Sequence, residues 1–125
     1  MSIKKQIYIG LGSNAGDRFS HLQAGIDAIH YEIGSIASIS SCYETPAKGF
    51  EGDKFINACV EVSSSLTPEL ILSKLLQIEE NYGRKRHNDG KYYNRTLDLD
   101  ILFFGEQIIE NELLTVPHPR IDKRL

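Results

Sequence analysis

The 125-residue sequence has few cysteines and no long apolar run. Its two cysteines, Cys42 and Cys59, form no Cys-x-x-Cys or Cys/His spacing of the kind that binds zinc. We therefore expect no zinc site and two reduced, mostly buried thiols. The apolar run Ile7-Tyr8-Ile9 is ended by the segment 10–14, far short of a signal-peptide core or a membrane span. These absences predict a cytoplasmic protein with no membrane partner.

Positive charge is also scarce outside one segment. The net charge is −3 and the sequence pI is about 5.8, which argues against a dedicated nucleic-acid or membrane-surface protein. Residues 84–95, however, carry five permanent cations and one acid. This segment is either a solvated basic loop or a local anion site. At this length we expect a single domain, residues 1–125, that buries roughly two-thirds of its unfolded surface.

The segment that follows, 95–104, alternates apolar and acidic residues with a period of two, which predicts a half-buried strand. Its two carboxylates, Asp98 and Asp100, would then point the same way and repel by roughly 2 kcal/mol at about 7 Å and an effective dielectric of about 20. Either water solvates this face, or the pair binds Mg²⁺ together with substrate phosphates. Beside the basic segment, the second alternative indicates phosphoryl transfer. The opposite, apolar face would contain Leu97, Leu99, Ile101 and Phe103.

Periodicity and turn residues predict the other elements. A helix should begin at Asp17 and end at Gly34, and a second should begin at the Thr67-Pro68-Glu69 cap and end at Gly83. The remaining segments read as strands at 6–11, 35–44 (weakly) and 54–62, a loop at 45–53, and a hairpin-like excursion at 106–116.

The order strand, helix, strand, strand, helix, strand fits an α+β, ferredoxin-like βαββαβ fold, an antiparallel sheet with two helices on one face. The ligand site is then expected on the opposite face. By alternation, the residues that point to that face are Tyr8, Gly10, Phe55, Asn57, Asp98 and Asp100.

Several polar residues allow both a bland and a functional interpretation. Asn57 and Phe55 could be merely exposed, or could bind the edge and the face of a flat heterocycle. The arginines of 84–95 could pair with surface acids or bind phosphate. Glu79 could be a solvated helix residue, and His118, held between two prolines, could bind phosphate or lie at the surface.

The motifs of the chain, in this order, closely resemble those of the 6-hydroxymethyl-7,8-dihydropterin pyrophosphokinases of folate biosynthesis. The resemblance spans essentially all 125 residues, and its last two motifs are the most specific. The motifs are Leu11-Gly12-Ser13-Asn14, Tyr43-Glu44-Thr45-Pro46, Phe55-Ile56-Asn57-Ala58, Gly83-Arg84, Arg95-Thr96-Leu97-Asp98-Leu99-Asp100 and Val116-Pro117-His118-Pro119-Arg120.

The resemblance implies an ATP-dependent diphosphotransferase that moves diphosphate from ATP to the hydroxymethyl group of the pterin and releases AMP. It implies two Mg²⁺ ions on Asp98 and Asp100, with Arg84 and Arg95 also catalytic. The implied pterin-binding residues are Thr45, Pro46, Lys48, Phe55 and Asn57. The implied ATP-binding residues are Glu79, Arg84, Arg86, Arg95, Ile101, Thr115, His118 and Arg124.

In such a reaction the hydroxyl oxygen attacks the β-phosphorus in line, and positioning and electrostatics supply most of the catalysis, so no general base is assigned. We expect the loops 45–53 and 84–95 to close over bound ATP.

The sequence departs from similar proteins at three places. They continue for a few dozen residues beyond the equivalent of Leu125, so we expect a domain that lacks the usual C-terminal segment. Tyr92 occupies the place of a tryptophan, and Lys48 that of an often hydrophobic residue. Two alternatives remain. The first is a non-catalytic nucleotide- or pterin-binding or assembly module, and the second, ranked last, is nucleic-acid binding on the sheet. We expect a monomer that does not bind nucleic acid.

Overall fold

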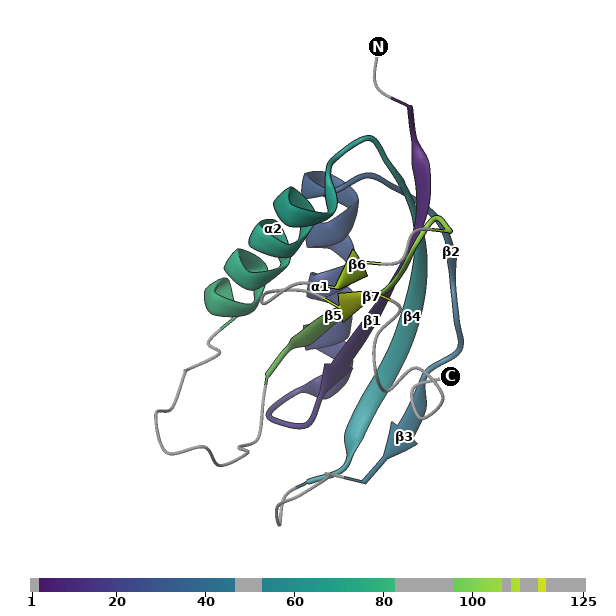
Figure 1. Cartoon of the computed structure of the whole chain (residues 1–125). Coiled ribbons are helices and arrows are strands. Elements are labelled where there is room, and N and C mark those ends of the chain that lie inside the picture. The colour runs from purple at the N-terminus through teal and green to yellow at the C-terminus, as the bar shows by residue number, and fades with distance from the viewer. Residues whose placement is uncertain (1–2, 47–52, 83–95, 107–108, 111–114, 117–125) are drawn as a thin grey trace.

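The computed structural model describes residues 3–46, 53–82, 96–106, 109–110 and 115–116, and it has one main antiparallel sheet with two helices on one face (Figure 1). The sheet order is β2-β4-β1-β5, and β3 also pairs with β4. The α+β, ferredoxin-like prediction is confirmed. The strands are β1 (Lys5–Ser13), β2 (Ser35–Ile39), β3 (Tyr43–Thr45), β4 (Phe55–Ser64) and β5 (Asp98–Phe104).

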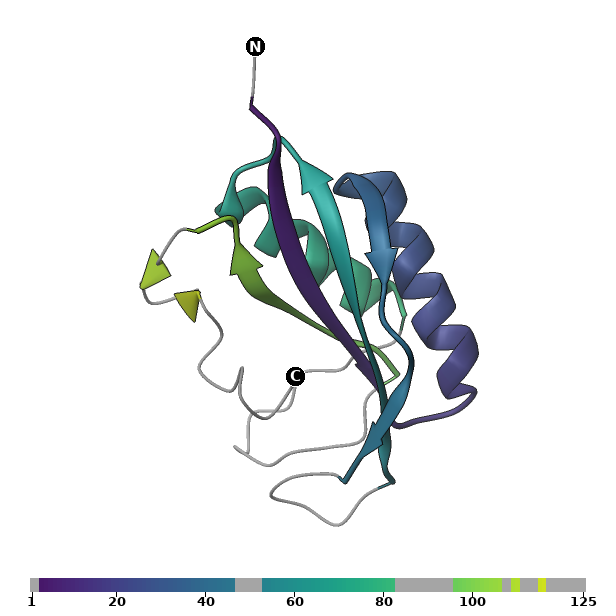
Figure 2. The same cartoon turned by 90° about the vertical axis from the view of Figure 1, so that its right-hand side faces the viewer.

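Both helices begin at the predicted caps. The side chain of Asp17 accepts a hydrogen bond from Ser20 N at the start of α1 (Arg18–Glu32), and Thr67 Oγ1 accepts one from Leu70 N at the start of α2 (Pro68–Asn81). The Ser20 bonds also lower the pKa of Asp17 below its usual value. Figure 2 shows both helices on the same side of the sheet, so among the described residues no helix covers the other face, which we call the helix-free face.

The core lies between the helices and the sheet, and on β1 and β4 it contains the residues that the alternation predicted. On β4, for example, Ile56, Ala58, Val60 and Val62 are all buried, while the residues between them are only partly buried. β1 pairs along its length with both β4 and β5, so the central strand fixes the register of the two strands that contain the candidate site residues.

One facing prediction on β5 was wrong. Ile101 pairs with Ile9, but Phe103 pairs with Tyr8, so the register shifts by one residue and Leu102 is the extra residue of a bulge. Phe104 therefore enters the core, and Phe103 lies on the helix-free face, edge-on to the Tyr8 ring with centroids 6.1 Å apart.

The weak strand predicted at 35–44 is divided into two strands, β2 and β3. The pairing of β2 with β4 contains a register shift, and β3 pairs separately with the other end of β4. The cysteine prediction was wrong for Cys42, which is exposed; Cys59 is half-buried, and both are reduced. The hairpin prediction is confirmed by two short strands, β6 (Ile109–Glu110) and β7 (Thr115–Val116), which pair antiparallel. In the part of the chain that the structure describes, neither helix is long and apolar enough to cross a membrane.

Candidate active site

Two glycines of β1 form a floor without side chains in the middle of the helix-free face. Gly10 and Gly12 lie opposite Asp100 and Asp98 on β5, and opposite Cys59 and Asn57 on β4. Because neighbouring strands are about 4.8 Å apart, the backbones of β4 and β5, which contain Asn57 and the two aspartates, lie roughly 10 Å from each other across this floor. We call Gly10 and Gly12 the glycine floor. Asn57 borders it on the β4 side, and Asp98 and Asp100 border it on the β5 side.

On the β4 side, the amide of Asn57 is held by β3. Its Nδ2 donates to the hydroxyl of Thr45 at 2.8 Å and to the carbonyl of Tyr43 at 3.2 Å. Its Oδ1 is directed at the glycine floor, since a Cβ on Gly12 would lie 3.2 Å from it and 3.2 Å from Cδ1 of Phe55. An amide oxygen beside an aromatic ring is suited to a flat ligand that carries N–H donors.

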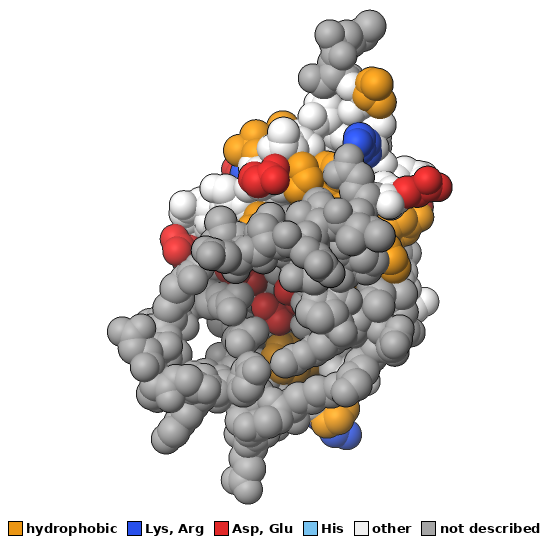
Figure 3. All heavy atoms as spheres, viewed as in Figure 1, with side chains coloured by type: hydrophobic (Ala, Val, Ile, Leu, Met, Phe, Trp, Pro, Cys, Tyr) orange, Lys and Arg blue, Asp and Glu red, His pale blue; other side chains and the backbone are white. Residues whose placement is uncertain are grey.

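On the β5 side, Asp98 and Asp100 are both half-buried and point to the helix-free face, as the alternation predicted. Acidic side chains are visible below the outermost atoms in the space-filling view (Figure 3). The opposing β1 residues are glycines, so no β1 side chain covers the carboxylates. Within the described ranges, no group of three or more His, Cys, Asp or Glu could hold a metal. Two carboxylates that point to the same face suit Mg²⁺, which is usually held by one or two carboxylates together with water and substrate oxygens.

Glu79 is not a solvated helix residue, so that interpretation was wrong. Its side chain is 1% exposed, and its Oε2 accepts the backbone N–H of Leu99 at 2.7 Å. Leu99 stands between the two aspartates and its side chain is in the core. The carboxylate of Glu79 thus binds the backbone of β5, the strand that contains both aspartates.

The other predicted site residues are placed as follows. Thr45 is partly buried and accepts a hydrogen bond from Asn57, and Pro46 is exposed. The side chain of Ile101 is in the core, so only its backbone could meet a nucleotide. Thr115 is on β7, and nothing is described of its side chain. Lys48, Arg84, Arg86, Arg95, His118 and Arg124 lie outside the described residues, as do the loop segments 47–52 and 83–95.

Sequence reasoning missed two residues that shape the site. Asn14 is 1% exposed, and its Nδ2 donates to the carbonyl of Asp53 at 3.0 Å, which ties the turn after β1 to the start of β4. The motif Gly12-Ser13-Asn14 was the available signal. Leu102 is 1% exposed but is not part of the core cluster. Its side chain packs over Gly10, since a Cβ on Gly10 would lie 3.4 Å from it. The alternation of β5 does not predict this position, because it depends on the bulge.

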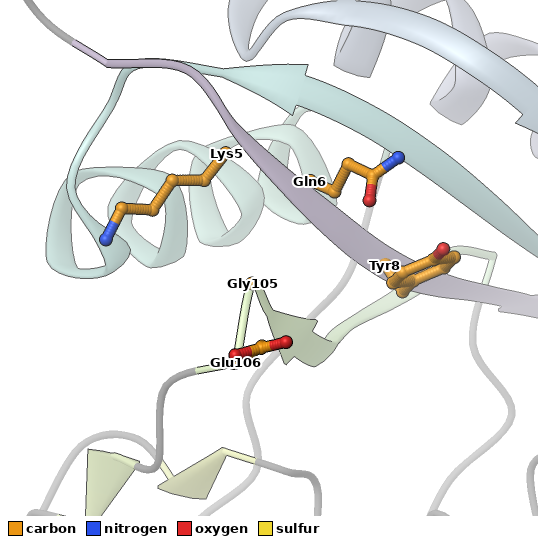
Figure 4. Close-up of a pocket in the computed structure, with 5 residues that line it drawn as sticks. All are labelled: Lys5, Gln6, Tyr8, Gly105 and Glu106. Carbon is orange, nitrogen blue, oxygen red and sulfur yellow. The ribbon is translucent and has the colours of Figure 1, made fainter.

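A second hollow lies at the other end of β1, and it is separate from the glycine floor. It has a volume of about 490 Å³ and contains none of the predicted site residues. Its lining, drawn in Figure 4, is Lys5, Gln6, Tyr8, Gly105 and Glu106. One cation and one acid on an open surface do not make a defined ligand site.

Comparisons with known proteins identify one family. Residues 8–125 match the family model described as 7,8-dihydro-6-hydroxymethylpterin-pyrophosphokinase (HPPK). The chain is 42% identical over 120 residues to the 2-amino-4-hydroxy-6-hydroxymethyldihydropteridine pyrophosphokinase of Bacillus subtilis (94% of this chain, 71% of that protein). It is 40% identical over 119 residues to the protein of the same name from Aquifex aeolicus (94% and 72%). A solved structure of HPPK-DHPS in complex with substrates matches with a TM-score of 0.71 over 97% of this chain and 38% of that chain; at 15% identity, this supports the fold alone.

Proposed function

The chain belongs to the 7,8-dihydro-6-hydroxymethylpterin-pyrophosphokinase family, and we propose that it transfers diphosphate from ATP to the hydroxymethyl group of 6-hydroxymethyl-7,8-dihydropterin, with AMP as the second product. The reaction is a step of folate biosynthesis. The family match favours this function over the main alternative, a non-catalytic binding or assembly module. A monomer in the cytoplasm remains a prediction.

The observation that carries the proposal is the glycine floor. Asn57 and Phe55 lie on one side of it and Asp98 and Asp100 on the other, so a flat heterocycle and a polyphosphate would meet over Gly10 and Gly12. A distance of about 10 Å between the two sides accommodates the pterin ring and its hydroxymethyl arm.

The residues of the chain would bind and orient the reactants. The Asn57 amide, oriented by Thr45, would bind the ring edge, and Phe55 would lie against the ring face. The pterin hydroxyl oxygen would then form a bond to the β-phosphorus while the bond from that phosphorus to the α–β bridging oxygen breaks. The hydroxyl proton passes to solvent, and AMP departs with the bridging oxygen. Alignment of the two reactants supplies much of the rate enhancement.

Asp98 and Asp100 would hold Mg²⁺, which when bound neutralises charge on the transferring phosphates. Without a bound cation, the same two carboxylates would repel the phosphates of ATP. This part of the proposal predicts that nucleotide binding depends on the divalent cation. The arginines 84, 86 and 95 would add permanent positive charge at the phosphates.

The proposal is tested by measuring AMP formation from ATP and Mg²⁺, with and without the pterin, for the wild type and for Asp98→Ala. We expect pterin-dependent AMP that is lost in the variant by a factor of at least about 10². Asp27→Ala, an exposed aspartate on α1, is the matched control and should retain full activity. A folded wild type that binds the ATP analogue but forms no AMP would overturn the proposal in favour of the binding module.

A further inference from the structure

We propose that Glu79 is a positioning residue, which fixes the direction of the Asp98 and Asp100 carboxylates through the backbone of Leu99 and does not itself contact the nucleotide. This inference rests on the proposed function for its activity readout, but its structural readout does not.

The burial of Glu79 needs an explanation. A carboxyl group in the core costs free energy unless hydrogen bonds offset its lost hydration, and an apolar side chain would fill the same space without that cost. Glu79 is 1% exposed, on the helix face that also buries Ile71, Leu75 and Ile78. Its bond to Leu99 N is 2.7 Å long, which is short for an N–H···O bond. The hydrogen bond that Glu79 Oε2 accepts from Leu99 thus explains why a carboxyl group is buried at this position.

The acceptor matters because β5 is an outer strand of the main sheet as described. An outer strand pairs through hydrogen bonds on one side only, and alternate N–H groups point away from the sheet. The N–H of Leu99 is such a group, and it donates to Glu79. Leu99 is the residue between the two aspartates in the sequence. Successive Cβ atoms of a strand point to opposite faces, so fixing the peptide at Leu99 fixes the face to which the Cβ atoms of Asp98 and Asp100 both point.

A second bond acts at the start of the same strand. The hydroxyl of Thr96 donates to the carbonyl of Tyr82. Tyr82 follows Glu79 by three residues, and Thr96 precedes Leu99 by three. The end of α2 therefore binds the start of β5 at two points, which we call the α2–β5 latch (Glu79 with Leu99, and Tyr82 with Thr96). Outer partners that orient metal-binding groups typically contribute 10- to 100-fold to affinity or activity.

The structural test is the Leu99 amide, observed by NMR in protein labelled with ¹⁵N-leucine and assigned by the peak that disappears in Leu99→Ile. In Glu79→Leu, we expect this amide to lose at least about 10-fold of its hydrogen-exchange protection. Glu79→Gln keeps an acceptor oxygen at the same reach and should retain most of the protection. Glu80→Gln, on the exposed neighbour, is the matched control and should change nothing.

The functional test is the Mg²⁺ dependence of ATP-analogue binding, measured by calorimetry, together with the kcat and KM of AMP formation. Glu79→Leu should weaken the Mg²⁺ dependence and lower kcat by about 10- to 100-fold, with the pterin KM unchanged. If Glu79→Leu does not fold, Glu79→Asp carries the test, since its carboxyl is one methylene too short to reach Leu99.

An unchanged Leu99 amide in folded Glu79→Leu or Glu79→Asp would overturn the proposal. So would a loss of nucleotide affinity with normal Leu99 protection and normal Mg²⁺ dependence, because Glu79 would then be a nucleotide contact. Failure of the proposed function is distinguishable: the wild type would form no pterin-dependent AMP, while the Leu99 amide and the Mg²⁺ dependence of analogue binding would still report on the latch.

Discussion

Gly12 on β1 lies so close to Asn57 on β4 that an added methyl group would have to displace its neighbours slightly. A Cβ on Gly12 would lie 3.2 Å from Oδ1 of Asn57, and equally close to the ring of Phe55. The two groups proposed to bind the pterin therefore pack closely against the backbone of Gly12. Gly12 is thus a determinant of the shape of the site, although it has no chemistry of its own.

Gly12→Ala should raise the pterin KM by about 10-fold, because displacing two closely packed groups costs about 1–3 kcal/mol. The ATP KM should change much less, since the methyl group is on the Asn57 side. Steady-state kinetics with each substrate varied in turn checks this. Gly10→Ala is the control: its Cβ would meet Leu102 at 3.4 Å, an ordinary contact, so a smaller effect is expected. An equal rise in the pterin KM for both variants would contradict the prediction.

Thr45→Val should weaken pterin binding without contacting the reaction centre. Thr45 Oγ1 accepts a hydrogen bond from the Asn57 amide at 2.8 Å, and a bond of this kind contributes about 1 kcal/mol. Its loss should raise the pterin KM roughly 5-fold and leave kcat nearly unchanged. Thr45→Ser keeps the hydroxyl and should behave as the wild type. A fall in kcat as large as the rise in KM would show that Thr45 acts on the chemical step instead.

The sequence predicted most of the fold because its signals were local and repeated. Strict alternation on β4 and the caps at Asp17 and Thr67 each determine an element from neighbouring residues alone. The placement of Asn57 and the two aspartates on one face followed from the same alternation, once the element order had indicated the sheet topology.

What the sequence did not predict depends on contacts between distant residues. The bulge at Leu102 arises from the pairing of β5 with β1, and it moved Phe103 out of the core. The burial of Glu79 depends on how α2 packs against β5, which helical periodicity does not specify. The tie between Asn14 and Asp53 spans 39 residues and leaves no local pattern.

Gly34→Ala should strongly destabilise the fold. A Cβ on Gly34, in the turn between α1 and β2, would lie 2.1 Å from the backbone carbonyl oxygen of Ser63, which cannot move without disturbing β4. We expect a loss of about 3 kcal/mol or more in the free energy of unfolding, measured by urea denaturation.

Gly105→Ala is the matched comparison, because there the added Cβ would have space. The nearest atom would be Cδ of Lys5 at 3.9 Å, but Gly105 has φ of 56°. Only the left-handed conformation should cost free energy, about 1–2 kcal/mol. If Gly105→Ala proved the more damaging of the two, the close approach at Gly34 would be refuted.

The two cysteines should differ in reactivity, and substrates should protect only one of them. Burial raises the pKa of the Cys59 thiol, because the half-buried position disfavours the thiolate. At pH 7–8, Cys59 should therefore react more slowly with a disulfide reagent than the exposed Cys42. The free-energy contribution of the neutral Cys59 thiol is complete below its unfolded pKa and is lost as pH rises through the raised, folded pKa.

Reaction rates for Cys42→Ser and Cys59→Ser, each of which leaves one thiol, separate the two sites. Cys59 lies opposite Gly10, so bound Mg²⁺, ATP analogue and pterin should slow its reaction further and leave Cys42 unaffected. In urea both thiols should react at the same rate, which controls for the reagent. Equal protection of both thiols by the ligands would point to a general tightening of the fold, and no protection of Cys59 would place the ligands away from the glycine floor.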